Sequence, residues 1–164
     1  MTDPTDPIRA AVIALLPRLR RFARLITRHR EDADDLVQVA VERALTHAAQ
    51  WQAGTRVDSW MFRIMKNAWI DEVRARVRRA EVLAPEEAGE QVGVSTTERQ
   101  IERLTIEKAM GRLSEEQRLV IGLVLIEGLP YKDAAEALDI PIGTLTSRLA
   151  RGRDALQQFL GETR

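Results

Sequence analysis

Hydroxyl and guanidinium side chains recur at helical spacing near the C-terminal end of the sequence. Thr144, Ser147, Arg148 and Arg151 are adjacent or three to four residues apart, so an α-helix would place them on one face. The opposite face would carry Leu145, Leu149, Leu156, Phe159 and Leu160. Hydroxyl and guanidinium groups hydrogen-bond the base edges and phosphate oxygens of DNA. The pattern therefore indicates a helix that binds DNA through its N-terminal half.

The residues before this helix predict a helix-turn-helix. Tyr131 to Leu138 has apolar residues at helical spacing, and Asp139 with Ile140 supplies a short turn. Pro141 would take the first helical position, where its missing N–H costs nothing. Such a motif places its second helix in a DNA major groove. The alternative is a short surface pair of helices whose arginines only keep the protein in solution.

Composition favours helices, and the length allows one medium domain or two small ones. Together with the helices that apolar periodicity predicts, it indicates an all-α protein made of two small helical domains. The chain has 164 residues, 45% of them hydrophobic but only 4% aromatic, and no cysteine. The absence of cysteine excludes disulfides, thiolate metal sites and cysteine nucleophiles. No apolar run approaches the length of a membrane span, and the first residues lack the layout of a signal peptide. We therefore expect a cytoplasmic protein without membrane insertion.

The charges sum to zero but are distributed unevenly along the chain. Bases dominate from 63 to 79 and acids from 81 to 116. Affinity for DNA scales with the number of phosphates that a protein neutralises, so a neutral chain should hold DNA weakly by itself. This pattern favours DNA binding as part of a larger assembly.

Apolar periodicity and capping residues predict the elements that position these side chains. In the N-terminal half we expect a helix from Asp6 to about Thr27, which Pro17 should kink or restart. A second helix should follow the acids at 31–35, and a third should begin at a cap at Asp58 or Ser59 and end near Arg78. A loop with Trp51 separates the second from the third. These helices form an expected domain of residues 1–80.

Residues 81–97 are predicted to form a flexible linker, because proline, glycine and acids occur there without periodicity. The expected second domain spans 98–164. Ser95 with Glu98 and Ser114 with Gln117 have the spacing of capping boxes. They predict helices at about 98–112 and 115–126, ahead of the helix-turn-helix.

Residues for catalysis are scarce. His29 lies near Asp34 and other acids, but those carboxylates are packed into a helix start, where acids stabilise the helix dipole. No second histidine is near, and phosphate-binding glycine loops and nucleophile elbows are absent from the sequence. We expect no metal, no cofactor and no enzymatic activity.

Two sets of motifs resemble a known family. Residues 34–38 (DDLVQ) and 60–64 (WMFRI), with Asn67 and Asp71, are similar to domain two of extracytoplasmic-function (ECF) sigma factors. Residues 113–118 (LSEEQR), 128–131 (GLPY) and 143–149 (GTLTSRL) are similar to domain four. The resemblance implies a factor that binds core RNA polymerase and directs it to promoter DNA. Domain four would read the minus-thirty-five duplex and domain two the single-stranded minus-ten element.

The resemblance also implies roles for residues of domain two. Trp51 matches a loop aromatic that holds an unstacked minus-ten base; the alternative is a tryptophan folded back on the core. The remaining minus-ten candidates are polar or basic, namely Arg63, Lys66, Asn67 and Arg74. The surface that grips the polymerase clamp helices would comprise Asp34, Asp35 and Gln38. Val39 and Ala40 depart from the family pattern at that surface.

Residues 16–22 (LPRLRRF) and 50–55 (QWQAGT) are also similar to ECF sigma factors of the alphaproteobacterial stress-response type. That subgroup implies a small helical anti-sigma factor as regulator. Two other classes compete. One is a stand-alone helix-turn-helix transcription regulator that binds a palindromic operator. The other is a site-specific recombinase, against which the lack of a nucleophile with an arginine pocket argues.

Overall fold

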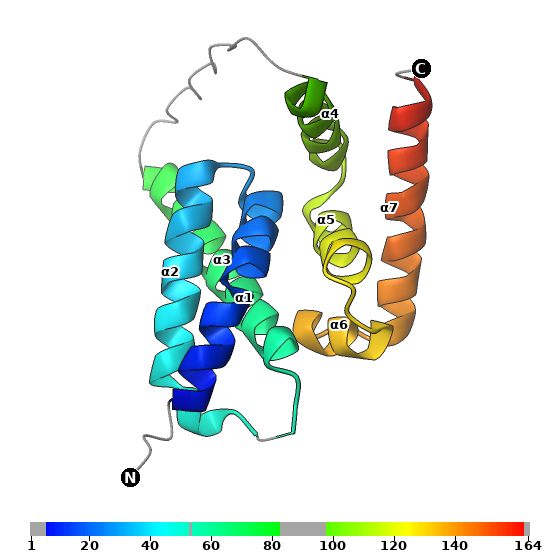
Figure 1. The fold of residues 1–164 in the computed structure, drawn as a ribbon. Coiled ribbons are helices and arrows are strands. Elements are labelled where there is room, and N and C mark those ends of the chain that lie inside the picture. The colour runs from blue at the N-terminus through cyan, green and yellow to red at the C-terminus, as the bar shows by residue number, and fades with distance from the viewer. Residues whose placement is uncertain (1–5, 53, 83–97, 163–164) are drawn as a thin grey trace.

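A computed structural model describes residues 6–52, 54–82 and 98–162, and those residues form helices and short connections without a strand (Figure 1). The N-terminal module consists of α1 (Asp6–Thr27), α2 (Arg30–Thr46), the 3₁₀ turn η1 (Ala48–Gln50) and α3 (Val57–Val82). The C-terminal module consists of α4 (Glu98–Gly111), α5 (Glu115–Ile121), the π-helical turn η2 (Gly122–Ile126), α6 (Tyr131–Leu138) and α7 (Ile142–Glu162). Among the described helices, none is both long and apolar enough to cross a membrane.

Helix α1 runs without a break through Pro17, so it does not restart there. Proline removes one backbone hydrogen bond, yet the turns on both sides of it are fixed by packing. Val12 before it and Leu19 and Phe22 after it are buried on the same side of the helix. The core thus holds both halves of α1 as one helix.

Helix α3 starts at Val57, before the two residues predicted as its cap, and it continues to Val82 rather than ending near Arg78. Phe62 of α3 packs edge-on against Phe22 of α1, with ring centroids 5.0 Å apart. Arg76 of α3 also binds Asp32 of α2 at 2.7 Å. The three long helices of this module are therefore joined by aromatic packing inside and by an ion pair outside.

The capping box at Ser114 and Gln117 is present, with each side chain bonded to the other residue's backbone N–H. The predicted helix from 115 to 126 is instead an α-helix to Ile121 followed by a π-helical turn, in which the Glu127 N–H donates to the Gly122 carbonyl. The helix-turn-helix matches its prediction closely. Helix α6 ends at Leu138, and Asp139 makes the turn in the left-handed region at φ 55°.

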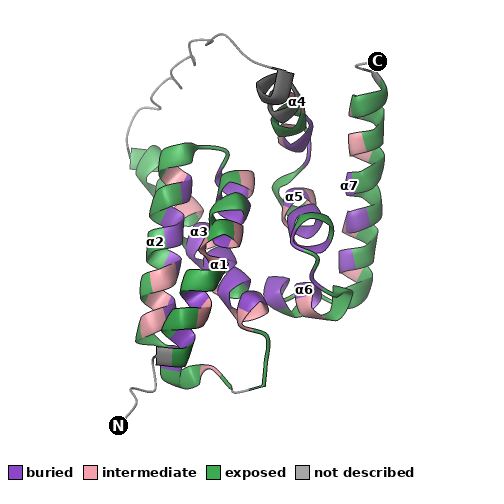
Figure 2. Ribbon diagram, viewed as in Figure 1, coloured by how far each residue is buried: buried purple, intermediate pink, exposed green. Residues whose placement is uncertain are grey.

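Buried residues of both modules belong to one continuous hydrophobic core, and Figure 2 shows them along the facing sides of the helices. Helix α6 lies across the first turns of α3, and α1 lies against α5 and η2 (Figure 1). The expected capping residue Ser95 and most of the expected linker fall outside the described residues. The sequence had given no reason to expect this contact between the modules.

Candidate nucleic-acid interface

The four residues predicted to bind the minus-thirty-five element lie together on the structure. Thr144, Ser147, Arg148 and Arg151 of α7 line one hollow of about 420 Å³. The start of α5 forms the other wall with three side chains that the sequence analysis had not assigned to DNA: Ser114, Glu116 and Gln117. The capping-box pattern had singled out Ser114 and Gln117, but only as the start of a helix.

One side chain in this hollow is already paired. The Arg148 guanidinium lies 3.5 Å from the Glu116 carboxylate, whereas Ser147 and Arg151 are exposed. Thr146 donates its hydroxyl to the Gly143 carbonyl at 3.0 Å and so stabilises the first turn of α7. Leu145 and Leu149 are buried beneath that turn. The core thus fixes α7 with its polar face outward, as the spacing predicts.

The residues predicted to bind the minus-ten element are divided between exposed and buried positions on α3. Arg63, Asn67 and Arg74 are exposed. These positions are four and seven residues apart, so they form a stripe along one side of the helix. The stripe could follow a nucleic-acid backbone over about three turns of helix.

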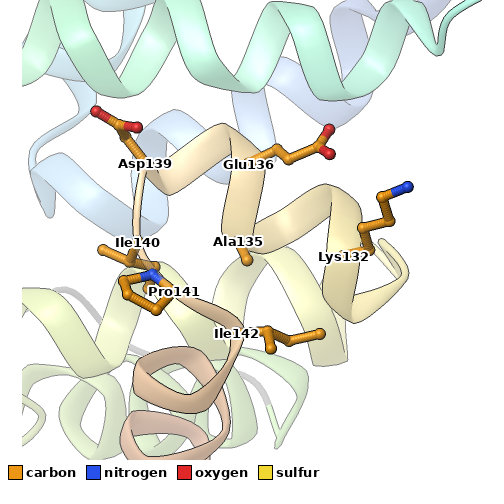
Figure 3. A pocket seen from close by; sticks show the side chains of 7 residues that line it. All are labelled: Lys132, Ala135, Glu136, Asp139, Ile140, Pro141 and Ile142. Atoms are coloured by element: carbon orange, nitrogen blue, oxygen red, sulfur yellow. The ribbon is translucent and has the colours of Figure 1, made fainter.

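Lys66 is the exception, because only 7% of it is exposed. Burial lowers the pKa of its ammonium group, and Arg63 lowers it further, whereas Asp139 at the end of α6 raises it. Figure 3 shows Asp139 where α6 turns toward α7, at the edge of a second hollow of about 520 Å³. Packing of α6 on α3 therefore encloses Lys66.

Trp51 is half-buried and packs against the hydrophobic core from the loop after η1. Its indole Nε1 is buried without a hydrogen-bond partner among the described residues, and so is Ser59 Oγ. A buried polar group of this kind costs about 1–3 kcal/mol. The Trp51 ring therefore contacts the core without being fully enclosed, and its role in holding a base stays a prediction.

The candidates for polymerase binding lie on the outer side of α2. Asp34, Asp35 and Gln38 are all exposed, one turn apart or adjacent. Asp32 is held differently, because Arg76 donates hydrogen bonds to it and lowers the pKa of its carboxyl. The acidic run thus separates into one residue that ties α2 to α3 and others that face outward.

Comparisons with known proteins match both modules. Residues 12–66 match the family model described as the Sigma2 domain of PhyR, and residues 103–156 match Sigma-70, region 4. The chain is 31% identical to the ECF RNA polymerase sigma factor EcfG of Rhodopseudomonas palustris over 95% of its own length and 86% of that protein. The chain belongs to the ECF RNA polymerase sigma factors. As an ECF sigma factor it directs RNA polymerase to initiate transcription at specific promoters.

Other relatives agree with this assignment. The sigma factor is 37% identical to SigM of Mycobacterium tuberculosis, over 88% of this chain and 72% of that one. Its fold is similar to that of RpoE from Bartonella quintana, which was solved in complex with the anti-sigma factor NepR. That likeness has a TM-score of 0.80 at 28% identity and covers 96% of this chain and 99% of RpoE.

Proposed function

We propose that the two modules divide promoter recognition, with domain two at residues 1–80, a linker at 81–97 and domain four at 98–164. In domain four, Ser147 and Arg151 read bases of the minus-thirty-five duplex, while Thr144 and Arg148 hold its backbone. The gathering of all four side chains in one hollow on the exposed side of α7 is the observation that carries this proposal.

Domain two is proposed to bind the minus-ten element as single strand. Arg63, Asn67 and Arg74 would follow the backbone along the exposed stripe of α3, and Lys66 would join them once uncovered. Trp51 would stack on an unpaired base, which is worth about 1–3 kcal/mol per base in such sites. Its incomplete burial and unpaired indole N–H support a ring that changes its surroundings on binding.

The outer side of α2 is proposed to bind core polymerase through Asp34, Asp35 and Gln38, because all three are exposed. The protein would then act in the cytoplasm as a regulatory binding protein, without a catalytic site or a cofactor. A small helical anti-sigma factor is the proposed regulator, supported by the likeness to RpoE, which was solved with NepR.

A transcription experiment tests this proposal. The protein is mixed with core polymerase and a library of promoters, and the transcript starts are sequenced. We expect starts downstream of one two-part motif, and weak, salt-sensitive binding to the same DNA when polymerase is omitted. Nanomolar binding of the free protein to a palindromic site at physiological salt would instead identify a stand-alone regulator.

The polymerase and anti-sigma surfaces have their own test. Asp34→Asn with Asp35→Asn should weaken polymerase binding, while Asp154→Asn on the exposed part of α7 should not. A purified NepR-type protein should bind the sigma factor and suppress transcription in the same assay. Equal polymerase binding by both variants would contradict the assignment to α2.

A further inference from the structure

A buried carboxylate of domain four is held by two arginines of domain two. Glu127 follows η2, and its side chain is fully buried. Arg21 of α1 binds it through two hydrogen bonds of 2.8 Å each. Arg18, one turn earlier, donates to the same carboxylate at 3.3 Å and to the Glu127 carbonyl at 3.0 Å. These contacts join residues more than 100 positions apart in the sequence.

Arg18 also connects this cluster to the start of α3. Its guanidinium lies 3.2 Å from Asp58, which Arg56 binds at 2.8 Å. It also stacks over the Phe62 ring, 5.4 Å from the ring centroid. Arg18 of α1 thus binds both α3 and the turn after η2. The position of domain four is therefore tied to α3, the helix that carries the exposed stripe of Arg63, Asn67 and Arg74.

The backbone of η2 comes unusually close to α1 at Gly122. A Cβ built at this position would lie 2.5 Å from Leu25 Cδ2 and 3.2 Å from Phe22 Cε2. A side chain at this position would require Leu25 and the buried Phe22 ring to move, since real Cβ atoms keep a greater distance. The π-helical turn begins at this glycine and ends at Ile126, directly before Glu127. The same short segment therefore provides the close approach and the buried acid.

The contact covers part of the proposed minus-ten surface. Helix α6 packs on α3, and Lys66 is 7% exposed beneath it. A lysine in this position has no access to a DNA strand while the domains are in contact. Arg63 and Asn67 on the same helix remain exposed. The arrangement of the two domains thus separates Lys66 from its proposed ligand but leaves its neighbours accessible.

We propose that Arg18, Arg21 and Glu127 form an interdomain latch that keeps domain four on the minus-ten surface of the free protein, and that polymerase binding opens it. The contact between the domains does not depend on DNA binding. Only its effect on promoter recognition rests on the proposed minus-ten role of α3. Charged groups suit a reversible contact, because all three regain water when the domains separate. Glu127→Gln removes the charge that both arginines bind, whereas loss of an arginine leaves the buried Glu127 carboxylate less compensated, so either change should open the latch.

The absence of cysteine in the chain allows a direct distance measurement. Ala80→Cys on α3 and Gln157→Cys on α7, both at exposed positions, carry a donor and an acceptor dye on the full-length protein. We expect one narrow distance in the free protein and a new distance on addition of core polymerase. Glu127→Gln should give the new distance without polymerase. Gly122→Leu should do the same by steric wedging, and Gly161→Leu, where a Cβ meets nothing within 4 Å, should not.

Affinity for core polymerase provides the second readout. If the open form is about 10% of the free protein, opening it completely tightens apparent binding about tenfold. Glu127→Gln should show this gain. The matched control is Glu72→Gln, because Glu72 is also held by two arginines, Arg76 at 3.0 Å and Arg79 at 3.1 Å, but within α3.

A charge exchange separates opening from misfolding. Arg21→Glu alone should open the domains, and Arg21→Glu combined with Glu127→Arg should restore the closed distance. The latch is overturned if Glu127→Gln matches Glu72→Gln in both distance and polymerase affinity. If the distance opens but Lys66→Ala leaves promoter opening unchanged, the latch stands and the proposed role of Lys66 fails.

Discussion

The two proposed DNA surfaces of this sigma factor differ in how they are built. The minus-thirty-five surface lies within one domain, where α5 and α7 form a hollow whose polar side chains face outward. The minus-ten surface lies on α3, and α6 of the other domain covers part of it. A surface formed within one domain is accessible to DNA in the free protein. A surface shared with another domain becomes available only when the domains separate, so the second can be controlled while the first stays constant.

The largest effect should come from removing the buried scaffold of the minus-thirty-five surface. Arg118 of α5 is 8% exposed and donates to the Met110 and Leu113 carbonyls, each at 3.1 Å. Burial and the charge of Arg28 lower the pKa of its guanidinium. Arg118→Leu should remove the bond to the Leu113 carbonyl and one of the two bonds to the Met110 carbonyl, which the Leu113 N–H also binds. We expect it to lower the free energy of unfolding by about 2–4 kcal/mol. Urea denaturation measures this change.

Arg118→Leu also tests whether the minus-thirty-five surface forms within domain four alone. Recognition of the minus-thirty-five element should be lost, whereas an isolated minus-ten single strand should still bind to the complex with polymerase. An exposed arginine on the same module, Arg153, offers the control, since Arg153→Leu should change the unfolding free energy little. Equal stability of the two variants would show that Arg118 is not the scaffold.

The next effect concerns Trp51, the residue of domain two that we propose to stack on a base. Loss of base stacking should reduce promoter opening by a factor that corresponds to about 1–3 kcal/mol. Trp51→Ala should show this loss, while Trp51→Phe keeps a ring against the core and removes the unpaired indole N–H. Permanganate reactivity near the start site measures opening, and polymerase binding should be unchanged in both variants. Normal opening by Trp51→Ala would assign the ring to the core alone.

Sequence patterns predicted the bounds, caps and exposed faces of single helices more successfully than the contacts between helices. The bounds of α6, the capping box at Ser114 and the outward polar face of α7 follow from local periodicity and capping, and the structure confirms them. Local rules did not decide the outcome at Pro17, where residues buried on both sides accompany a helix that runs on without a break. The roles predicted for individual DNA-binding residues remain predictions.

The contact between the domains could not be predicted from the sequence, for a different reason. Glu127 looks like any exposed acid near a helix end, and Arg21 like any basic residue on an amphipathic helix. Nothing in their spacing relates them, because the pairing depends on the π-helical turn that directs Glu127 toward α1. The family resemblance placed Lys66 among the DNA-binding residues, and no sequence pattern indicates that a second domain packs over it.

A smaller effect should distinguish two arginines of the minus-thirty-five surface. Arg151 is exposed, whereas Arg148 is paired with Glu116 at 3.5 Å. A bidentate arginine–guanine contact discriminates by about 1–3 kcal/mol at one base pair, while a phosphate contact affects all sequences alike. Arg151→Ala should therefore relax preference at one minus-thirty-five position, and Arg148→Ala should reduce activity evenly. Transcription from single-base promoter variants measures both, and a uniform loss with Arg151→Ala would transfer base reading to Ser147 or Thr144.

The smallest effect should appear on acidification, through Asp58 at the start of the shared surface. Burial raises the pKa of the Asp58 carboxyl, but hydrogen bonds from Arg56, the Ser59 N–H and Arg18 outweigh it, so the pKa lies below its ordinary value. Arg18 also binds Glu127, so the Asp58 and Glu127 carboxylates belong to one cluster. A carboxyl with a lower pKa in the folded chain stabilises the fold above its unfolded-state pKa. That contribution is lost as pH falls through the folded pKa.

Asp58→Asn should therefore lower the free energy of unfolding by about 1 kcal/mol near neutral pH, and by progressively less once the pH falls below about 4. Urea denaturation of both proteins at a series of pH values measures the difference. Asp71→Asn is the matched control, because Asp71 pairs with Arg43 at 3.2 Å on an exposed surface, where an ion pair contributes little. A difference for Asp58→Asn that stayed constant down to about pH 2 would mean that its contribution is packing rather than charge. The Arg18 link between the two domains would then depend on Glu127 alone.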